Sequence, residues 1–242
     1  ACDIRHLGQS LRDFGLIRQK LADMATLYFV AEAALYRTGD LIDSAFHAND
    51  GSIDGNRKAA EEFAVECSAV KVFSTECESR IVDDALQIYG GYGFTEEFPI
   101  ARVYRDARVS RIYEGTNEIN RLFIADRLYR KLRDGAITMC PDSFVSELCA
   151  KAYSKYESGQ VVLGALSDLT ILSYVEQSAR TRARHGGLAA AAHGRFVNWA
   201  NCQAAQAYQT ITGEAVQIPA SNLGHVDDLA EALLTTRRPV SF

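Results

Sequence analysis

Apolar positions repeat about every 3.6 residues through most of this chain. Between residues 12 and 44 the repeat contains Ile17, Leu21, Met24, Tyr28, Ala31 and Leu35. This spacing puts the apolar side chains on one face of a helix, which can then pack against a core over many turns. We therefore expect a long bundle helix near the start of the chain.

A second long helix is expected over Arg57–Tyr89, after the polar, glycine-containing connection His47–Asn56. The segment contains no proline, and apolar or charged residues fill it. The run Gly90-Gly91-Tyr92-Gly93 ends it, because glycine is common just after a helix.

Further helices follow, separated by short loops. A brief helix is expected over Ile100–Asp106, and a third main helix over Thr116–Arg133, with Ile119, Leu122 and Phe123 at its apolar positions. The remaining helical patterns cover approximately 142–157, 160–184, 189–211 and 225–236.

The pattern predicts an all-α fold. We expect an antiparallel bundle resembling a four-helix bundle, followed by a second helical unit. The boundary is placed near residue 138, which gives one unit of residues 1–138 and another of 139–242.

Composition narrows the classes of function. The chain has 242 residues, 48% of them hydrophobic, and a net charge of -5 with acidic and basic residues interleaved. No basic face suggests nucleic acid, and no apolar run reaches the roughly 20 residues that span a bilayer. We expect small-molecule or protein partners.

Six cysteines are present, at positions 2, 67, 77, 140, 149 and 202. They lack the paired spacing and the accompanying histidines of a zinc site, and they form no recognisable disulfide framework. We expect no metal, and reduced, mostly buried thiols in an intracellular protein.

One acidic residue stands in an unusual place. In "SRIYEGTNEINR" (Ser110–Arg121), Glu114 and Gly115 come directly before Thr116, a good N-cap for the third main helix. The amides of Asn117, Glu118 and Ile119 then lack partners within the helix, which attracts anions and polar ligand atoms. Glu114 is a candidate base, although an ordinary acidic turn before a helix has the same sequence.

A glycine-rich stretch, "QIYGGYGF" (Gln87–Phe94), lies only a short connection upstream. It follows a helix and not a strand, so it is not the dinucleotide fingerprint of a Rossmann fold. Gly90 alone is simply a helix C-cap. Gln87–Gly91 could also let the backbone come close to a flat or phosphorylated ligand.

Together these stretches resemble the acyl-CoA dehydrogenase family. The carboxy-terminal helical domain of that family contains segments similar to "ALQIYGGYGF" and "RVYRDARVSRIYEGTNEI", in this order and at this spacing, and opens on a helix similar to "FGLIRQKLADM". The resemblance covers about residues 4–135. Residues 139–242 resemble, more loosely, the extra carboxy-terminal helical domain of very-long-chain acyl-CoA dehydrogenases.

The resemblance implies an FAD-dependent oxidation of an acyl-CoA thioester. Glu114 would remove the α-proton while a hydride passes from the β-carbon to FAD, and Gly115 would adjoin the substrate. Thr116, Asn117 and Glu118 match positions facing the flavin nucleotide. Gln87, Ile88, Tyr89, Gly90 and Gly91 match a segment that binds the FAD of a neighbouring subunit, which implies a homo-oligomer, a dimer being favoured. Electrons would pass on to electron-transfer flavoprotein.

Two departures from the family pattern stand out. Where the family has Arg-x-x-Phe-Gly, with the arginine on the FAD diphosphate, this chain reads "IRHLG". Arg5 lies one position after the place of the family's arginine, and it is a candidate cofactor contact for that reason alone. The family's amino-terminal helical domain and middle β-domain have no counterpart here. We expect a fragment of a longer protein that binds FAD weakly or not at all by itself.

The sequence is therefore compatible with three hypotheses of function. The first is an acyl-CoA dehydrogenase of fatty-acid oxidation, located in a bacterial cytoplasm or a mitochondrial matrix. The second is an oxygen-using acyl-CoA oxidase relative. The third is a catalytically silent helical scaffold for dimerisation or complex assembly, which would have no need of a base at position 114.

Overall fold

The computed structural model describes residues 2–3, 5–6, 8–49, 51–220 and 226–235. Its helices are α1 (Gly15–Ala48), α2 (Ile53–Glu62), α3 (Ala64–Tyr89), α4 (Gly91–Phe94), α5 (Pro99–Val109), α6 (Asn117–Arg133), α7 (Phe144–Tyr153), α8 (Gln160–Ala183), α9 (Gly187–Thr212) and α10 (Val226–Thr235). A 3₁₀ turn at Leu11–Asp13 precedes α1, and β1 (Arg5–His6) pairs antiparallel with β2 (Gln9–Ser10). The predicted all-α fold is confirmed, apart from this small hairpin.

The second expected helix is two helices. Phe63 interrupts it as a turn between α2 and α3, and α2 already begins inside the expected connection, where the Ser52 hydroxyl accepts a hydrogen bond from the Gly55 amide at 2.9 Å. A serine cap of this kind starts a helix by satisfying an amide that has no partner within the helix. The connection is therefore shorter than the sequence suggested.

The core face of α1 differs from the expected stripe. Leu21 is buried, but Leu35 is 57% exposed, and the other buried positions combine small residues such as Ala22 and Ala25 with Leu27, Phe29 and Val30. Small side chains let neighbouring helices approach α1 closely, so its buried face is broader than one row of large residues. On α6, similarly, Ile119 and Phe123 are exposed, and Ile124, Ala125 and Leu128 supply the core.

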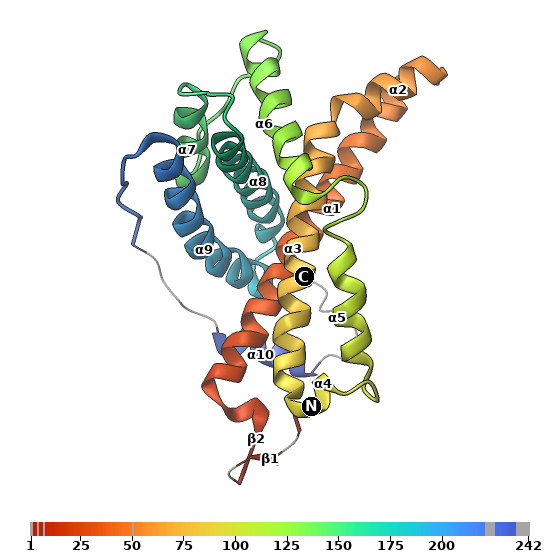
Figure 1. Cartoon of the computed structure of the whole chain (residues 1–242), viewed down its shortest axis with the longest axis vertical. Coiled ribbons are helices and arrows are strands. Elements are labelled where there is room, and N and C mark those ends of the chain that lie inside the picture. The colour runs from red at the N-terminus through yellow and green to blue at the C-terminus, as the bar shows by residue number, and fades with distance from the viewer. Residues whose placement is uncertain (1, 4, 7, 50, 221–225, 236–242) are drawn as a thin grey trace.

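The helices form two groups on either side of a central pair. Figure 1 shows α1 and α3 side by side, α5 flanking α3 on one side, and α7, α8 and α9 grouped on the other. α6 lies between α3 and α8, and α10 packs across α1. The turn that leads from α5 into α6 therefore borders α3.

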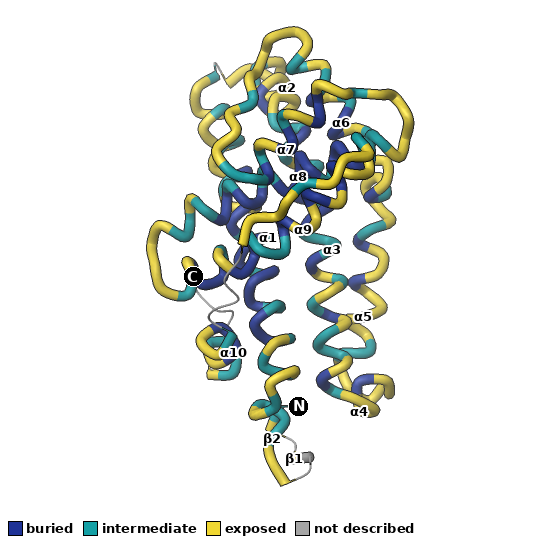
Figure 2. The backbone as a smooth tube through the Cα atoms, turned by 90° about the vertical axis from the view of Figure 1, so that its left-hand side faces the viewer, coloured by how far each residue is buried: buried dark blue, intermediate teal, exposed yellow. Residues whose placement is uncertain are grey.

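One cluster of buried residues extends through both parts of the chain. It joins Phe29 and Val72 of the first part to Leu166, Val175 and Phe196 of the second. The Phe196 ring meets the Phe73 ring edge-on, with centroids 5.9 Å apart. Figure 2 shows burial concentrated where α1 meets α8 and α9, whereas α4 and α5 are largely exposed. The division near residue 138 stays a prediction, and packing across it is extensive.

The cysteines are less buried than expected. Cys77 and Cys149 are buried, Cys2 is half-buried, and Cys67, Cys140 and Cys202 are exposed, all with free thiols. Burial raises the pKa of Cys149 to about 12, with only a weak opposing effect from its contact with Thr170. Within the described ranges, no helix is long and apolar enough to cross a membrane.

Candidate active site

Glu114 occupies a strained backbone position. Its φ angle is 55°, the only positive φ at a non-glycine residue in the described part of the chain. Left-handed backbone costs a non-glycine residue about 1 kcal/mol or more, and it persists where the surroundings fix it. Gly115 follows with a φ of 77°. The two residues form a tight turn that leaves the Glu114 side chain exposed at its edge.

Two side chains hold this turn through its carbonyl groups. The Lys71 ammonium group on α3 donates to the Gly115 oxygen at 2.9 Å. The Asn120 amide donates to the same oxygen at 2.8 Å and to the Thr116 oxygen at 3.1 Å. A Cβ built on Gly115 would lie 3.1 Å from the Asn120 nitrogen, so glycine is favoured there by space as well as by φ.

At the start of α6, the predicted cap at Thr116 is present, but the backbone amide of Asn117 is not free as predicted. The Thr116 hydroxyl caps the helix by accepting from the Ile119 amide at 3.3 Å. The Asn117 amide, expected to be free, donates to the Arg111 carbonyl oxygen at 3.2 Å. The helix start is therefore closed in this conformation by the chain that precedes it.

Asn117 is buried, with 2% of its surface exposed. Its side-chain oxygen accepts from Lys71 at 2.8 Å, and its amide donates to Thr75 and to Glu76, both at 3.1 Å. The side chain thus faces α3 and is fully engaged, so a contact with a flavin would have to come from its backbone.

Glu118 points the other way, into solvent. Its own backbone amide and, to a lesser extent, the Thr116 hydroxyl donate to its carboxylate and hold its pKa below the usual range. An anionic side chain therefore caps the helix start that was expected to attract anions.

Behind this turn, Arg121 bridges two carboxylates. It donates to both Glu76 oxygens, at 2.8 and 3.0 Å, and from Nε to Asp168 of α8 at 2.8 Å. Burial opposes the charge of Arg121, but its bonds to Glu76 and the two carboxylate charges raise its pKa. For Asp168, burial raises the pKa, and Arg121 only partly offsets this.

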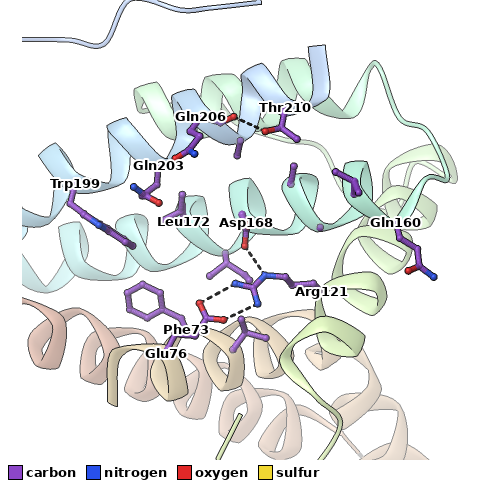
Figure 3. A pocket seen from close by; sticks show the side chains of 16 residues that line it. Phe73, Glu76, Arg121, Gln160, Asp168, Leu172, Trp199, Gln203, Gln206 and Thr210 are labelled. Atoms are coloured by element: carbon purple, nitrogen blue, oxygen red, sulfur yellow. Dashed lines mark hydrogen bonds and ion pairs between the residues drawn. The ribbon is translucent and has the colours of Figure 1, made fainter. Parts of the chain in front are cut away.

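These three residues form the floor of a pocket of about 480 Å³. Figure 3 shows Arg121 pointing between Glu76 and Asp168, with Trp199, Gln203 and Gln206 of α9 along the opposite wall. Glu114 and Gly115 are not among the lining residues. This pocket is therefore separate from the candidate base.

The glycine-rich stretch caps α3. Gly90 has a φ of 61°, and its amide donates to the Leu86 and Gln87 oxygens at 3.2 and 3.1 Å. Gln87, Gly90 and Gly91 are exposed, Tyr89 is half-buried and Ile88 is buried. No heavy atom lies within 4 Å of a Cβ built on Gly90 or Gly91, apart from their chain neighbours and, for Gly91, the backbone of its own helix. The backbone at these two glycines is therefore open to a ligand.

Within one chain, the Glu114 turn and the Gln87–Gly91 segment lie near different parts of α3. Lys71, which touches the Glu114 turn, and Gln87 are separated by sixteen residues of α3. At 1.5 Å per residue this is about 24 Å. The Gln87–Gly91 segment and Glu114 therefore do not face a common pocket in this chain.

The surface around Glu114 is unusually apolar. Ile112, Tyr113 and Ile119 are 51%, 53% and 59% exposed. Contiguous exposed apolar side chains of this size mark an interaction surface. Arg5, in β1, is also exposed. Ile4, which stands at the family's arginine position, lies outside the described residues.

Sequence reasoning missed Lys71, Asn120 and Arg121. Asn120 could have been found, because it lies four residues after Thr116 on the same helix face. Lys71 and Arg121 act through contacts between distant helices, for which a single sequence gives no signal. No group of three or more metal-binding side chains occurs in the described ranges.

Comparison with known proteins gives a consistent picture. Residues 2–129 match the family model described as acyl-CoA dehydrogenase, C-terminal domain. A probable acyl-CoA dehydrogenase from Bacillus subtilis (strain 168) is 40% identical over 140 residues, which cover 56% of this chain and 23% of that protein. The very long-chain specific mitochondrial acyl-CoA dehydrogenase of Bos taurus is 38% identical over 125 residues, covering 52% and 17%.

A solved structure extends the likeness. The crystal structure of an acyl-CoA dehydrogenase complexed with FAD from Bacillus anthracis superposes with a TM-score of 0.70 at 32% identity, covering 86% of this chain and 41% of that one. The structural likeness therefore reaches beyond residue 138. The chain spans less than a quarter of the length of the two curated relatives above.

Proposed function

Because the chain belongs to the acyl-CoA dehydrogenase family, we propose that it is the part of a flavin-dependent acyl-CoA dehydrogenase that supplies the base. The observation that carries this proposal is the turn at Glu114. A carboxylate stands in left-handed backbone immediately before a capped helix, in a segment that the family model matches. Strain of this kind concentrates at functional sites.

In the proposed reaction, Glu114 takes the proton from the α-carbon of an acyl-CoA thioester, and a double bond forms between the α- and β-carbons. FAD, when bound, accepts the hydride that leaves the β-carbon. Glu114 is exposed in this chain, so a bound substrate would have to expel water from the turn to make the carboxylate an effective base. Gly115 would adjoin the substrate.

The residues present fit a flavin nucleotide in part. Gly90 and Gly91 offer open backbone, and the exposed Gln87 offers an amide. At α6, the Thr116 hydroxyl and the Asn117 side chain have internal partners, and the Asn117 and Ile119 backbone amides are also engaged, so a cofactor would have to displace one of these bonds or meet Glu118. We propose that Gln87, Ile88, Tyr89, Gly90 and Gly91 contact the FAD of a second subunit, with Ile88 acting through its backbone.

The separation of about 24 Å along α3 supports the proposal that Gln87–Gly91 contact the cofactor of a second subunit. A segment that cannot reach the Glu114 turn of its own chain can serve the cofactor of a partner. The proposed assembly is therefore at least a homodimer, and electron-transfer flavoprotein is the proposed acceptor. Arg5 is retained as a candidate contact with the diphosphate, because it is exposed.

We further propose that more polypeptide completes the site. The exposed apolar side chains Ile112, Tyr113 and Ile119 flank Glu114 in the sequence, and they are the kind of surface that another domain covers. The 242 residues alone should then hold FAD weakly. Flavin absorbance that stays with this chain through gel filtration would contradict that expectation.

The test of function is anaerobic mixing of the complete, flavin-loaded protein with a series of acyl-CoA thioesters. Loss of the oxidised flavin absorption band is expected, and its rate ranks the chain lengths. Rapid oxygen consumption by the reduced protein would favour the oxidase reading over the dehydrogenase. A flavin band unchanged by any thioester would favour the scaffold reading.

A further inference from the structure

The Glu114 turn is one end of a continuous line of polar contacts. The Gly115 carbonyl oxygen accepts from Lys71 at 2.9 Å, and the same ammonium group donates to the Asn117 side-chain oxygen at 2.8 Å. Lys71 therefore ties the turn to the first residue of α6. No other charged side chain in the described part of the chain has a hydrogen bond to a backbone atom of residues 114–116.

The line continues from Asn117 to the carboxy-terminal helices. The side-chain amide group of Asn117 donates to Glu76 at 3.1 Å. Glu76 accepts two bonds from Arg121, and Arg121 donates to Asp168 at 2.8 Å. The Ser167 hydroxyl adds a second link from α8, to the Arg121 carbonyl oxygen. Six side chains on α3, α6 and α8 thus connect α8 to the turn.

These contacts have the properties that positioning requires. Asn117 is buried, and the exposed fractions of the Arg121, Glu76 and Asp168 side chains are 21%, 40% and 44%. Charge-assisted bonds in a partly buried setting are stronger and better directed than those in water. A non-glycine residue keeps a positive φ only when its neighbours over-determine it. Asn120 and Lys71 supply that constraint through the Gly115 carbonyl.

We propose that Lys71 positions the Glu114 turn, and that Asp168 of α8 supports it through Arg121, Glu76 and Asn117. The carboxy-terminal helices would then contribute to the geometry of the base, in addition to the core they share with the first part of the chain. The proposal deepens the proposed function and rests on it where catalysis is concerned. The structural part concerns this chain alone.

The test is hydrogen–deuterium exchange of the 242-residue chain, read in a peptide covering residues 110–121. In Lys71→Met, the loss of a charged donor should speed amide exchange in this peptide roughly tenfold. Lys71→Arg, which keeps the charge and the donors, should return most of the protection. Asp168→Asn should show a smaller increase of the same sign, roughly two- to fivefold.

Lys58→Met is the matched control, since Lys58 is an exposed lysine of α2. Exchange in peptides from α9 should remain unchanged in every variant that folds. Equal exchange of residues 110–121 in wild type and Lys71→Met would overturn the proposal. If Lys71→Met does not fold, Asp168→Asn and Lys71→Arg still decide the proposal. Exchange of residues 110–121 that is unchanged in Asp168→Asn, or as fast in Lys71→Arg as in an unprotected peptide, counts against it.

Activity adds an independent readout. In the flavin-loaded protein, Lys71→Met should slow flavin reduction while leaving the dissociation constant of the acyl-CoA nearly unchanged, and Lys71→Arg should recover much of the rate. Should wild type fail to reduce flavin at all, the proposed function fails, whereas the exchange experiment still tests the positioning of the turn.

Discussion

Arg121 of α6 and Asp168 of α8 meet at 2.8 Å across the boundary expected near residue 138. Arg121 also holds Glu76 with two bonds, so one guanidinium group joins three helices. Replacing it would leave two partly buried carboxylates facing each other. We predict that Arg121→Met lowers the free energy of unfolding by about 1–2 kcal/mol, discounted from the buried-pair range because both carboxylates are partly solvated.

The measurement is urea-induced unfolding of the two proteins. Arg130→Met is the control, because Arg130 is 59% exposed and forms an ion pair with Asp126 of its own helix. It should cost no more than about 0.5 kcal/mol. An Arg121 variant as stable as the Arg130 variant would show that the bridge contributes little to stability.

Position 93 requires glycine because there is no room for a side chain, and not because of its backbone angles. A Cβ built there would lie 2.8 Å from both the Leu86 carbonyl oxygen and the Tyr89 Cβ. We predict that Gly93→Ala destabilises the chain by roughly 1–3 kcal/mol, because backbone must move to admit the methyl group. Gly91→Ala is the matched variant: its Cβ meets nothing within 4 Å, and thermal unfolding should show a change within about 0.5 kcal/mol. Similar losses from both substitutions would refute this explanation.

The positive φ of Glu114 has an energetic consequence. Glu114→Gly and Glu114→Ala both remove the carboxylate, but only glycine relieves left-handed backbone. We predict that the glycine variant is more stable than the alanine variant by about 1 kcal/mol in chemical denaturation. An alanine variant of equal or greater stability would mean that the turn is not strained.

A pH dependence is expected where α7 meets α8. Arg180 donates to the Asp142 carboxylate at 2.6 Å, and this bond holds the pKa of Asp142 below its usual range. A lowered folded-state pKa contributes stability above the unfolded value of about 3.9, and the contribution is lost as pH falls through the folded value.

We therefore predict that Asp142→Asn is less stable than wild type at pH 7, by no more than about 1 kcal/mol, since nearly half of the Asp142 side chain is exposed. The difference should shrink below about pH 4. Urea unfolding of both proteins across pH 3–7 checks this. A difference that stays constant over that range would assign the effect to something other than the Asp142 charge.

The helices could be predicted from sequence because their signals are local. The cap at Thr116, the stop at Gly90 and the length of α1 all depend on neighbouring residues. The break at Phe63 has no proline or glycine to announce it. The buried face of α1 was predicted only in part because several helices cover it, so that small residues such as Ala22 and Ala25 are buried in addition to large ones.

The site could be predicted only in part, for the same physical reason. Glu114, Gly115 and Thr116 stand together in the sequence, and their turn could be expected from that. Lys71 lies 44 residues before Gly115 and reaches it only because α3 packs beside α6. Likewise, the backbone amide of Asn117 meets the Arg111 carbonyl oxygen only because the chain folds back before α6.

The central claim is that Glu114 removes the α-proton of an acyl-CoA thioester. The most direct measurement is the anaerobic rate of flavin bleaching by an acyl-CoA in the complete protein, for wild type, Glu114→Gln and the control Glu157→Gln, an exposed glutamate after α7. We predict a loss of roughly 10²- to 10⁴-fold in Glu114→Gln and none in Glu157→Gln. Bleaching by Glu114→Gln at the wild-type rate would contradict the claim and require a different base.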